Sequence, residues 1–183
     1  MHDQPKYEPL EVSNFFGDGR TSRDPVSGTV ARGQLRDNDH LYRGIGPDGQ
    51  LATTMPVPMS SELLGRGRER FDIFCSPCHG RIGNGQGMIV RRGFKQPESF
   101  HQNRLREVPV GYFFEIMTNG FGQMSGYASQ VPVGDRWAIA AYVRALQLSR
   151  NISVAELTPA DLKMLEAREG AQPAEPPSEE GHE

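Results

Sequence analysis

The stretch Cys75-Ser76-Pro77-Cys78-His79 contains both cysteines of this 183-residue chain, and it decides the fold. A Cys-x-x-Cys-His sequence is typical of haem attachment, of a redox dithiol or of half a zinc site. In a short helical turn, two such thiols can each form a thioether with a porphyrin vinyl group, and the histidine can reach the iron from the same side. We therefore predict one covalently bound haem c, attached through Cys75 and Cys78, with His79 as an axial iron ligand.

The other interpretations of this motif find no support elsewhere in the sequence. A zinc site would need about two more ligands, but there is no third cysteine, and the four remaining histidines are scattered without paired spacing. A thioredoxin-like dithiol is expected after a strand in a βαβ context, which this sequence does not show. A structural disulfide across so short a loop would restrict little chain entropy.

Composition favours one small domain with long flanking segments. Only 36% of the residues are hydrophobic, and the chain has 21 glycines and 14 prolines, which excludes a helical bundle throughout its length. No run approaches the roughly 18 to 20 apolar residues that a membrane span requires. The net charge of -3 gives no reason to expect nucleic acid as a partner.

Charge is unevenly distributed along the chain. Residues 64–150 carry 12 basic and 6 acidic side chains, whereas residues 1–63 carry 6 and 9, and residues 151–183 carry 2 and 8. A positive centre between acidic flanks indicates either docking of the centre on an acidic partner or a solvated surface on which charges happen to segregate. The sequence leaves both interpretations open.

The order of segments predicts three parts. Residues 1–60 are polar and rich in turns, so we expect an extended partner-binding segment with few helices. Residues 61–150 should form the monohaem domain. Residues 151–183 should form a short helix followed by an acidic tail, because residues 171–183 hold three prolines, four glutamates and no basic residue. Such a composition predicts disorder in the tail.

The first helix of the haem domain should deliver the cysteine motif at its end. Ser60 or Ser61 can cap a helix that runs to Cys75, with apolar residues spaced about one turn apart. Gly67 lies inside this helix, where a glycine costs about 1 kcal/mol relative to alanine. We therefore expect another helix to cross closely at Gly67.

Three further helices follow from caps and apolar spacing. They are expected over about residues 109–118, ended by Gly120, over about residues 134–148, and over about residues 158–168. The second of these should face the first haem-domain helix across small residues. Its apolar positions are Trp137, Ala140, Ala141, Val143, Ala145 and Leu148.

The residue opposite His79 decides between electron transfer and catalysis. A sixth ligand closes the iron for electron transfer, whereas an open position admits small molecules. Met124 lies in a glycine-rich loop between the last two helices of the haem domain, far enough along the chain to reach the opposite face. It is either the sixth ligand or a thioether that fills a gap in the core. His101 is the rival ligand, or else a residue of the surface or of the propionate side.

These motifs carry a family resemblance. The cysteine motif, the glycine loop after it, the segment Pro97-x-Ser99-Phe100, the Met124 loop and the stretch Asp135-Arg136-Trp137-Ala138-Ile139 resemble a class I cytochrome c, an all-α fold. More narrowly, residues 1–7, 28–33 and 127–132 resemble the monohaem cytochrome c subunit of alternative complex III, a membrane assembly that oxidises quinol. The likeness covers about residues 1–150.

The resemblance implies a site and a role. It implies thioethers at Cys75 and Cys78, axial ligands His79 and Met124, and a proline whose carbonyl holds the histidine ring, for which Pro97 is the candidate. This loop has Ser125 where the family usually has a proline after the methionine. The chain is then an electron-transfer subunit and no enzyme by itself. It would relay electrons from a quinol:electron acceptor oxidoreductase complex to a cytochrome c or a terminal oxidase.

Two other functions stay open for this chain. The alternatives are a peroxidase-like monohaem enzyme with an open sixth iron position, and a haem c subunit of another membrane dehydrogenase.

Bacteria attach haem c outside the cytoplasm, and Met1 to Leu10 holds no apolar leader core, so we expect a signal segment to have been removed. By resemblance, the protein lies on the periplasmic side of the inner membrane, lipid-anchored through a cysteine upstream of this chain.

Overall fold

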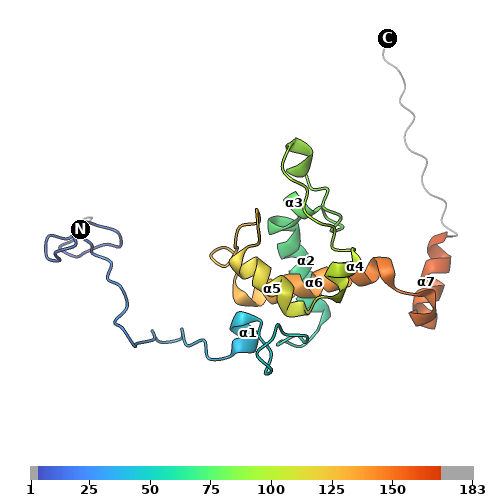
Figure 1. Ribbon diagram of the computed structural model, residues 1–183, viewed down its shortest axis with the longest axis horizontal. Helices are drawn as coiled ribbons and strands as arrows, with labels where there is room; N and C mark the ends of the chain where they lie inside the picture. Colours follow the sequence, from blue (N-terminus) through green and yellow to red (C-terminus); the bar gives the residue numbers. More distant parts are fainter. Residues whose placement is uncertain (1–3, 170–183) are drawn as a thin grey trace, which may run out of the picture. The chain divides into compact units, whose positions relative to one another are not determined.

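The computed structural model describes residues 4–169 of the chain. These residues form helices and isolated bridges but no strand. The chain divides into two compact units, the N-terminal unit Met1–Asp37 and the helical unit Asn38–Glu183 (Figure 1). The helices are α1 (Asp39–Arg43), α2 (Ser61–Phe74), α3 (Ser76–His79), η1 (Val90–Arg92), α4 (Asn103–Glu107), α5 (Val110–Asn119), α6 (Val133–Asn151), η2 (Val154–Glu156) and α7 (Pro159–Glu169).

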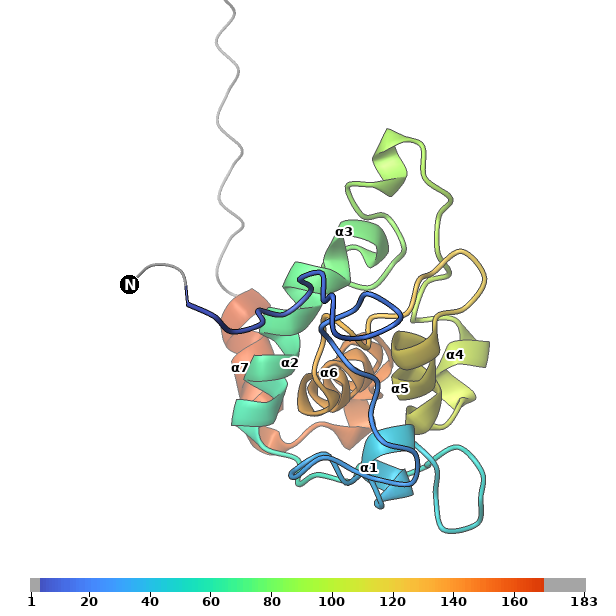
Figure 2. The same ribbon diagram turned by 90° about the vertical axis from the view of Figure 1, so that its left-hand side faces the viewer.

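The close helix crossing expected at Gly67 is confirmed. Helices α2 and α6 pack against each other in the helical unit (Figure 2). A Cβ atom on Gly67 would lie well under 3.0 Å from the carbonyl group of Ala138, so no larger residue fits without moving the backbone. This contact fixes α2 against α6, and α2 in turn holds the cysteine motif that follows it.

Aromatic side chains fill the core between α2, α5 and α6. Trp137, Phe71 and Phe114 are fully buried. The Phe114 ring stacks on Trp137 with the two centroids 4.5 Å apart and an interplanar angle of 18°. Burying a large side chain of this kind contributes about 2 to 3 kcal/mol, so the helical unit has a core of its own.

Local sequence signals set the helix ends as expected. The Ser60 hydroxyl caps α2 by accepting a hydrogen bond from the backbone N–H of Leu63 at 3.0 Å. Gly120 ends α5, and its N–H donates to the Ile116 carbonyl. Helix α6 is longer than predicted, and Leu148, expected on its apolar face, is 57% exposed.

Residues 38–60 are part of the helical unit, which differs from the predicted boundary at residue 60. The indole N–H of Trp137 donates a hydrogen bond of 2.7 Å to the carbonyl oxygen of Leu41. Ala52 is buried in the core, and its backbone exchanges two hydrogen bonds with the backbones of Gly44 and Gly111. These contacts join segments far apart in sequence, so the extended composition of residues 38–60 did not reveal them.

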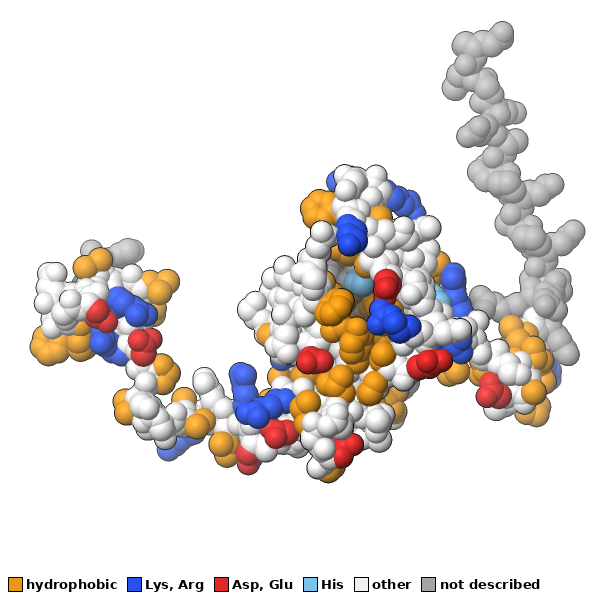
Figure 3. Space-filling model, in the orientation of Figure 1, with side chains coloured by type: hydrophobic (Ala, Val, Ile, Leu, Met, Phe, Trp, Pro, Cys, Tyr) orange, Lys and Arg blue, Asp and Glu red, His pale blue; other side chains and the backbone are white. Residues whose placement is uncertain are grey.

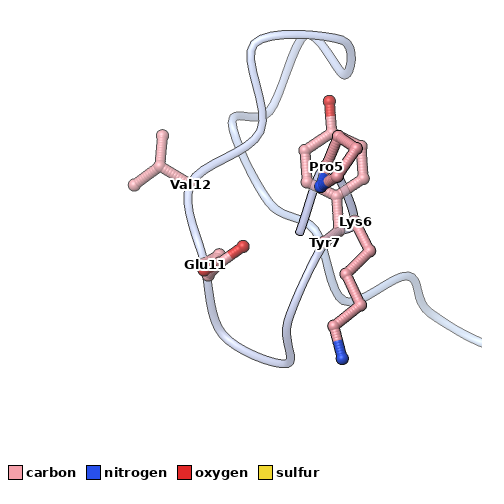
Figure 4. A pocket seen from close by; sticks show the side chains of 5 residues that line it. All are labelled: Pro5, Lys6, Tyr7, Glu11 and Val12. Atoms are coloured by element: carbon pink, nitrogen blue, oxygen red, sulfur yellow. The ribbon is translucent and has the colours of Figure 1, made fainter. Parts of the chain in front are cut away.

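The N-terminal unit is a set of turns with little interior. Val12 pairs with Arg20 in an isolated bridge, and of residues 4–37 only Ser13 is buried. Leu10 is 91% exposed, and Phe15 is 79% exposed. An open pocket of about 420 Å³ lies between Tyr7 and the neighbouring turn (Figure 4). The apolar side chains Leu10 and Phe15 are therefore exposed on the surface of this unit and do not form a core within it.

Two expectations concern the ends of the chain and the membrane. Helix α7 begins at Pro159 as predicted. The hydroxyl of Thr158, the residue before the helix, donates a hydrogen bond of 2.6 Å to the Asp161 carboxylate in its first turn. The acidic tail, residues 171–183, lies outside the described residues. Within residues 4–169, no helix has the length and apolar character needed to cross a bilayer.

Candidate haem site

The cysteine motif forms one tight helical turn at the end of α2. Cys75 ends α2, and its carbonyl oxygen accepts hydrogen bonds from the N–H groups of Cys78 at 3.2 Å and His79 at 2.9 Å. Pro77 lies in the first turn of α3, where its missing N–H costs nothing. Both cysteines are half-buried free thiols. The turn therefore presents two unpaired thiols and an imidazole from three nearby positions of one backbone.

The His79 imidazole is buried and uncharged. Its ring stacks on Phe100 with the centroids 4.6 Å apart and an interplanar angle of 14°. Burial lowers the pKa of His79 to about 4, so the imidazole carries no proton charge near neutral pH. Its Nδ1 atom is buried without a hydrogen-bond partner among residues 4–169. Such a nitrogen requires a partner that these residues do not supply, such as a water molecule, an ion or a bound group.

Burial also raises the pKa of the Cys75 thiol, to about 12, with a smaller contribution from Cys78. Redox-active Cys-x-x-Cys motifs depend on a depressed thiol pKa, so this thiol lacks the character of a thioredoxin-like nucleophile. Around the described residues, no group of three or more His, Cys, Asp and Glu side chains is placed to hold a metal ion by itself. The geometry thus favours haem over the other two interpretations of the motif.

Glycines bring the following loop back against the attachment turn. The N–H of Gly85 donates to the His79 carbonyl at 2.8 Å, and that of Gly87 donates to the Cys78 carbonyl at 3.0 Å. A Cβ atom on Gly87 would lie well under 3.0 Å from the carbonyl of Pro77. Only glycine permits this approach, so the loop is fixed directly beneath the two cysteines.

Pro97 lies where this loop returns, with its carbonyl oxygen against Gly85. No hydrogen bond joins that carbonyl to the His79 ring within the described residues, because Nδ1 has no partner. The role of Pro97 in holding the histidine therefore stays a prediction. Phe100, three residues later, contacts the ring directly and is anchored by its own N–H, which donates to the Gly83 carbonyl at 2.9 Å.

Met124 occupies a tightly closed loop between α5 and α6. Its N–H and carbonyl oxygen both bond to the backbone of Phe121, each at 2.9 Å. Gly120, at the start of the loop, has a left-handed φ of 83° and leaves no room for a Cβ atom beside the Met124 carbonyl. The Met124 side chain is half-buried and packs at the edge of the core. Its ligation of iron stays a prediction, supported by this placement.

Tyr127 follows Met124 by three residues and is close enough to the cysteines to respond to their charge. Its N–H donates to the Met117 carbonyl at 2.7 Å, which ties the loop to α5. The pKa of Tyr127 is raised, mainly by burial and further by the negative charge that Cys78 and Cys75 would carry nearby. Cys75, Met124 and Tyr127 all pack against the same hydrophobic core.

His101, the rival ligand, contacts the backbone through one of its two ring nitrogens. Its Nε2 atom lies 2.7 Å from the Ile82 carbonyl, on the loop that follows His79. Its backbone N–H bonds to the Ser99 hydroxyl at 3.3 Å. Its Nδ1 atom, like that of His79, is buried without a hydrogen-bond partner among residues 4–169. The role of His101 as a rival ligand therefore stays a prediction.

The residues present fit a covalently bound haem. The residues that would hold it are two free thiols, a neutral imidazole with an unpaired nitrogen and a half-buried methionine. Hydrophobic side chains gather at the surface of the helical unit on the face shown in Figure 3. Sequence reasoning placed the cysteines and His79 but missed the ring contact of Phe100 and the position of Tyr127. Both residues were noted only as parts of longer stretches, because neither residue type indicates haem contact by itself.

The comparisons with known proteins agree with this geometry. Residues 62–143 match the protein family described as "Cytochrome C oxidase, cbb3-type, subunit III". A search of curated proteins found no match. This region is therefore a class I cytochrome c domain with covalently bound haem c, and it transfers electrons.

Two solved structures are similar to the chain. One is a chain of the reducing HAO-like protein complex of Kuenenia stuttgartiensis, with 19% identity over 58% of this chain and a TM-score of 0.45. The match spans only 54% of that protein's chain. The other is cytochrome cL from Hyphomicrobium denitrificans, with 23% identity, a TM-score of 0.39, and coverage of 60% of this chain and 70% of that chain.

Proposed function

We propose that this cytochrome c domain belongs to the monohaem subunit of alternative complex III. In this role it relays electrons from a quinol-oxidising membrane complex to a cytochrome c or a terminal oxidase. The observation that supports the electron-carrier role is the attachment turn, in which Cys75, Cys78 and the neutral His79 come from one helical turn. The subunit would work on the periplasmic side of the bacterial inner membrane.

Each residue of the site has a separate task in this proposal. Bound haem c supplies a centre that accepts and releases one electron at a time. Cys75 and Cys78 tether the group, so it stays in place although the domain is small. His79 offers a nitrogen lone pair at neutral pH because burial keeps its pKa low. Met124 offers a thioether, which stabilises the reduced state better than a second imidazole would.

Removing the Met124 thioether tests the carrier role against an open catalytic site. The reduced wild-type holoprotein should keep its low-spin spectrum when carbon monoxide is added, because both axial positions are filled. Met124→Ala should bind carbon monoxide and show a lower midpoint potential. Met164→Ala, which removes a 62% exposed methionine on α7, is the matched control and should behave as wild type. A Met124→Ala protein with unchanged spectrum and potential would assign the sixth ligand to another residue.

The N-terminal unit supports membership of a membrane complex. Leu10 and Phe15 are displayed to solvent, and Leu10 has a left-handed φ of 67°, which is unfavourable for a non-glycine residue. A conformation of this kind persists where surrounding contacts compensate for it. Because a single acyl chain binds a membrane only marginally, a lipid on an upstream cysteine would also need protein contacts. The proposed contacts are made by residues 1–37.

Deleting residues 1–37 tests this attachment. The truncated protein should still carry haem, because the deletion leaves the helical unit whole. It should wash out of the detergent-solubilised complex, whereas the full chain should co-purify with it. A truncated protein that stays bound would place the attachment on the helical unit, and co-purification with no quinol-oxidising activity would overturn the assignment to this complex.

A further inference from the structure

The loop Gly80–Pro97, which we call the basic loop, carries charge of a single sign. It contains Arg81, Arg91, Arg92 and Lys95 and has no acidic residue. All four side chains are exposed, and none of them forms an ion pair within residues 4–169. Their charge is therefore available to a partner.

Apolar side chains are exposed among these charges. Ile82 is 47% exposed, Met88 55% and Phe94 70%. A shallow groove of about 470 Å³ runs between Pro77, Met88 and Arg91. Aromatic residues, methionine and arginine are enriched at protein interfaces, so the surface has the composition of a docking patch and not only of a solvated loop.

The basic loop is joined to the haem attachment turn by backbone contacts. The N–H of Ile89 donates to the Pro77 carbonyl at 3.0 Å, beside the bond from Gly87 to Cys78. Helix η1 then leads the loop away, so that it projects beyond α3 (Figure 2). A partner bound to this surface would lie against the residues that tether the cofactor, where the path for an electron is short.

We propose that the basic loop is the docking surface for an acidic electron-transfer protein. The inference rests on the proposed carrier function and names the kind of partner that the carrier meets. In the encounter the reduced cytochrome loses one electron and the partner gains it, with no atom transferred. Electrostatic attraction would speed the encounter, and the apolar side chains would make the close contact. Redox encounters use small interfaces, which suits a single loop.

Charge reversal on the loop provides the main test. The reduced full-length holoprotein is mixed in a stopped-flow instrument with plastocyanin, used as the acidic blue-copper probe, and the second-order rate of oxidation is measured. The test variant is Arg81→Glu/Arg91→Glu/Arg92→Glu. Reversing three docking charges should slow the reaction at least about tenfold at low salt. In 1 M salt, where the Debye length is about 3 Å, most of the difference should disappear.

The matched control changes the same net charge elsewhere in the helical unit. It is Arg68→Glu/Arg106→Glu/Arg150→Glu, at three exposed positions on α2, α4 and α6. This control should slow the reaction much less than the loop variant. Equal slowing by both variants would show that net charge matters and not the loop, and an unaffected loop variant would also overturn the proposal.

The apolar part of the surface is tested by Phe94→Ser, which should slow the reaction about threefold at both salt concentrations. Val154→Ser, at an equally exposed position on η2, is its control and should have no effect. An anionic lipid surface is the rival occupant of a basic and apolar loop. Binding of the wild type to phosphatidylserine vesicles, lost in the charge-reversal variant while plastocyanin oxidation stays normal, would assign the loop to lipid and overturn the proposal.

Failure of the carrier function itself would be seen separately. A spectroelectrochemical titration of the wild type should show one reversible one-electron transition. A protein without that transition is no carrier, whatever docks on the loop. A protein with the transition whose loop variants react normally with plastocyanin keeps the carrier role and loses only the docking surface.

Discussion

The two units of the chain differ in what their apolar side chains contact. In the helical unit, Trp137, Phe71 and Phe114 are buried around the crossing of α2 and α6. In the N-terminal unit, Leu10 and Phe15 are exposed, and residues 4–37 bury only Ser13. The hydrophobic effect therefore stabilises the helical unit from within. It can stabilise the N-terminal unit only through a partner that covers those side chains.

Disrupting the helix crossing should have the largest effect on the stability of the helical unit. Gly67→Val should prevent stable folding of the helical unit, because its Cβ atom would meet the Ala138 carbonyl well under 3.0 Å and the helices would have to separate. Overpacking of this kind costs about 1 to 3 kcal/mol or more, and here rigid backbone makes the cost larger. Thermal unfolding followed by circular dichroism, with haem-stained gels for holoprotein yield, would measure the loss.

The same helix offers a matched control. Nothing lies within 4 Å of the position that a Cβ atom on Gly65 would occupy, and the residue is exposed. Gly65→Ala should therefore stabilise α2 by up to about 1 kcal/mol through helix propensity alone. If Gly67→Val unfolds no more easily than wild type, the close crossing is not present in solution.

Two truncations locate the boundary between the units. Removing residues 1–37 should leave the unfolding temperature of the helical unit unchanged, since this cut falls between the two compact units. Removing residues 1–58 should lower it, because Ala52 and the Leu41 contact to Trp137 are lost with that segment. Losing several packed side chains and a hydrogen bond should cost about 2 to 5 kcal/mol. Equal stability of the two truncated proteins would restore a boundary near residue 60.

The position of this boundary illustrates what the sequence could and could not predict. Helix caps and apolar spacing depend on neighbouring residues, so Ser60 and the crossing at Gly67 could be recognised from the sequence. The Cys-x-x-Cys-His spacing of the attachment turn is required by few other kinds of site, so the turn could also be recognised from the sequence. By contrast, Leu41 and Trp137 are 96 residues apart, and the ring of Phe100 meets His79 only after the glycine loop has folded back. Contacts of that kind leave no local pattern.

A smaller effect should follow from the single hydrogen bond that fastens residues 38–60 to α6. Trp137→Phe keeps an aromatic ring in the core but removes the indole N–H that donates to the Leu41 carbonyl. The loss should lower the free energy of unfolding by about 1 to 3 kcal/mol, since the ring also shrinks and the acceptor is left without this donor. The haem spectrum should stay as in wild type.

The protein that lacks residues 1–37 provides the control for this substitution. Leu41 is still present there, so Trp137→Phe should have the same cost in the truncated and the full-length protein. Chemical denaturation of the four proteins would measure both differences. A cost that disappears on truncation would mean that the N-terminal unit, and not Leu41, depends on Trp137.

The smallest effect on stability should come from the N-terminal unit itself. Phe15 is 79% exposed, and among residues 4–169 its only close aromatic neighbour is Phe16, with the ring centroids 5.0 Å apart. Phe15→Ser should therefore change the unfolding temperature of the isolated holoprotein very little, because it removes almost no buried area. The same substitution should weaken retention of the subunit in the detergent-solubilised complex if a partner covers this side chain. Val154→Ser, at a similarly exposed apolar residue of the helical unit, should leave retention unchanged. Co-purification of the two variants separates attachment from folding: normal retention of Phe15→Ser would mean that the exposed side chain is not part of the contact.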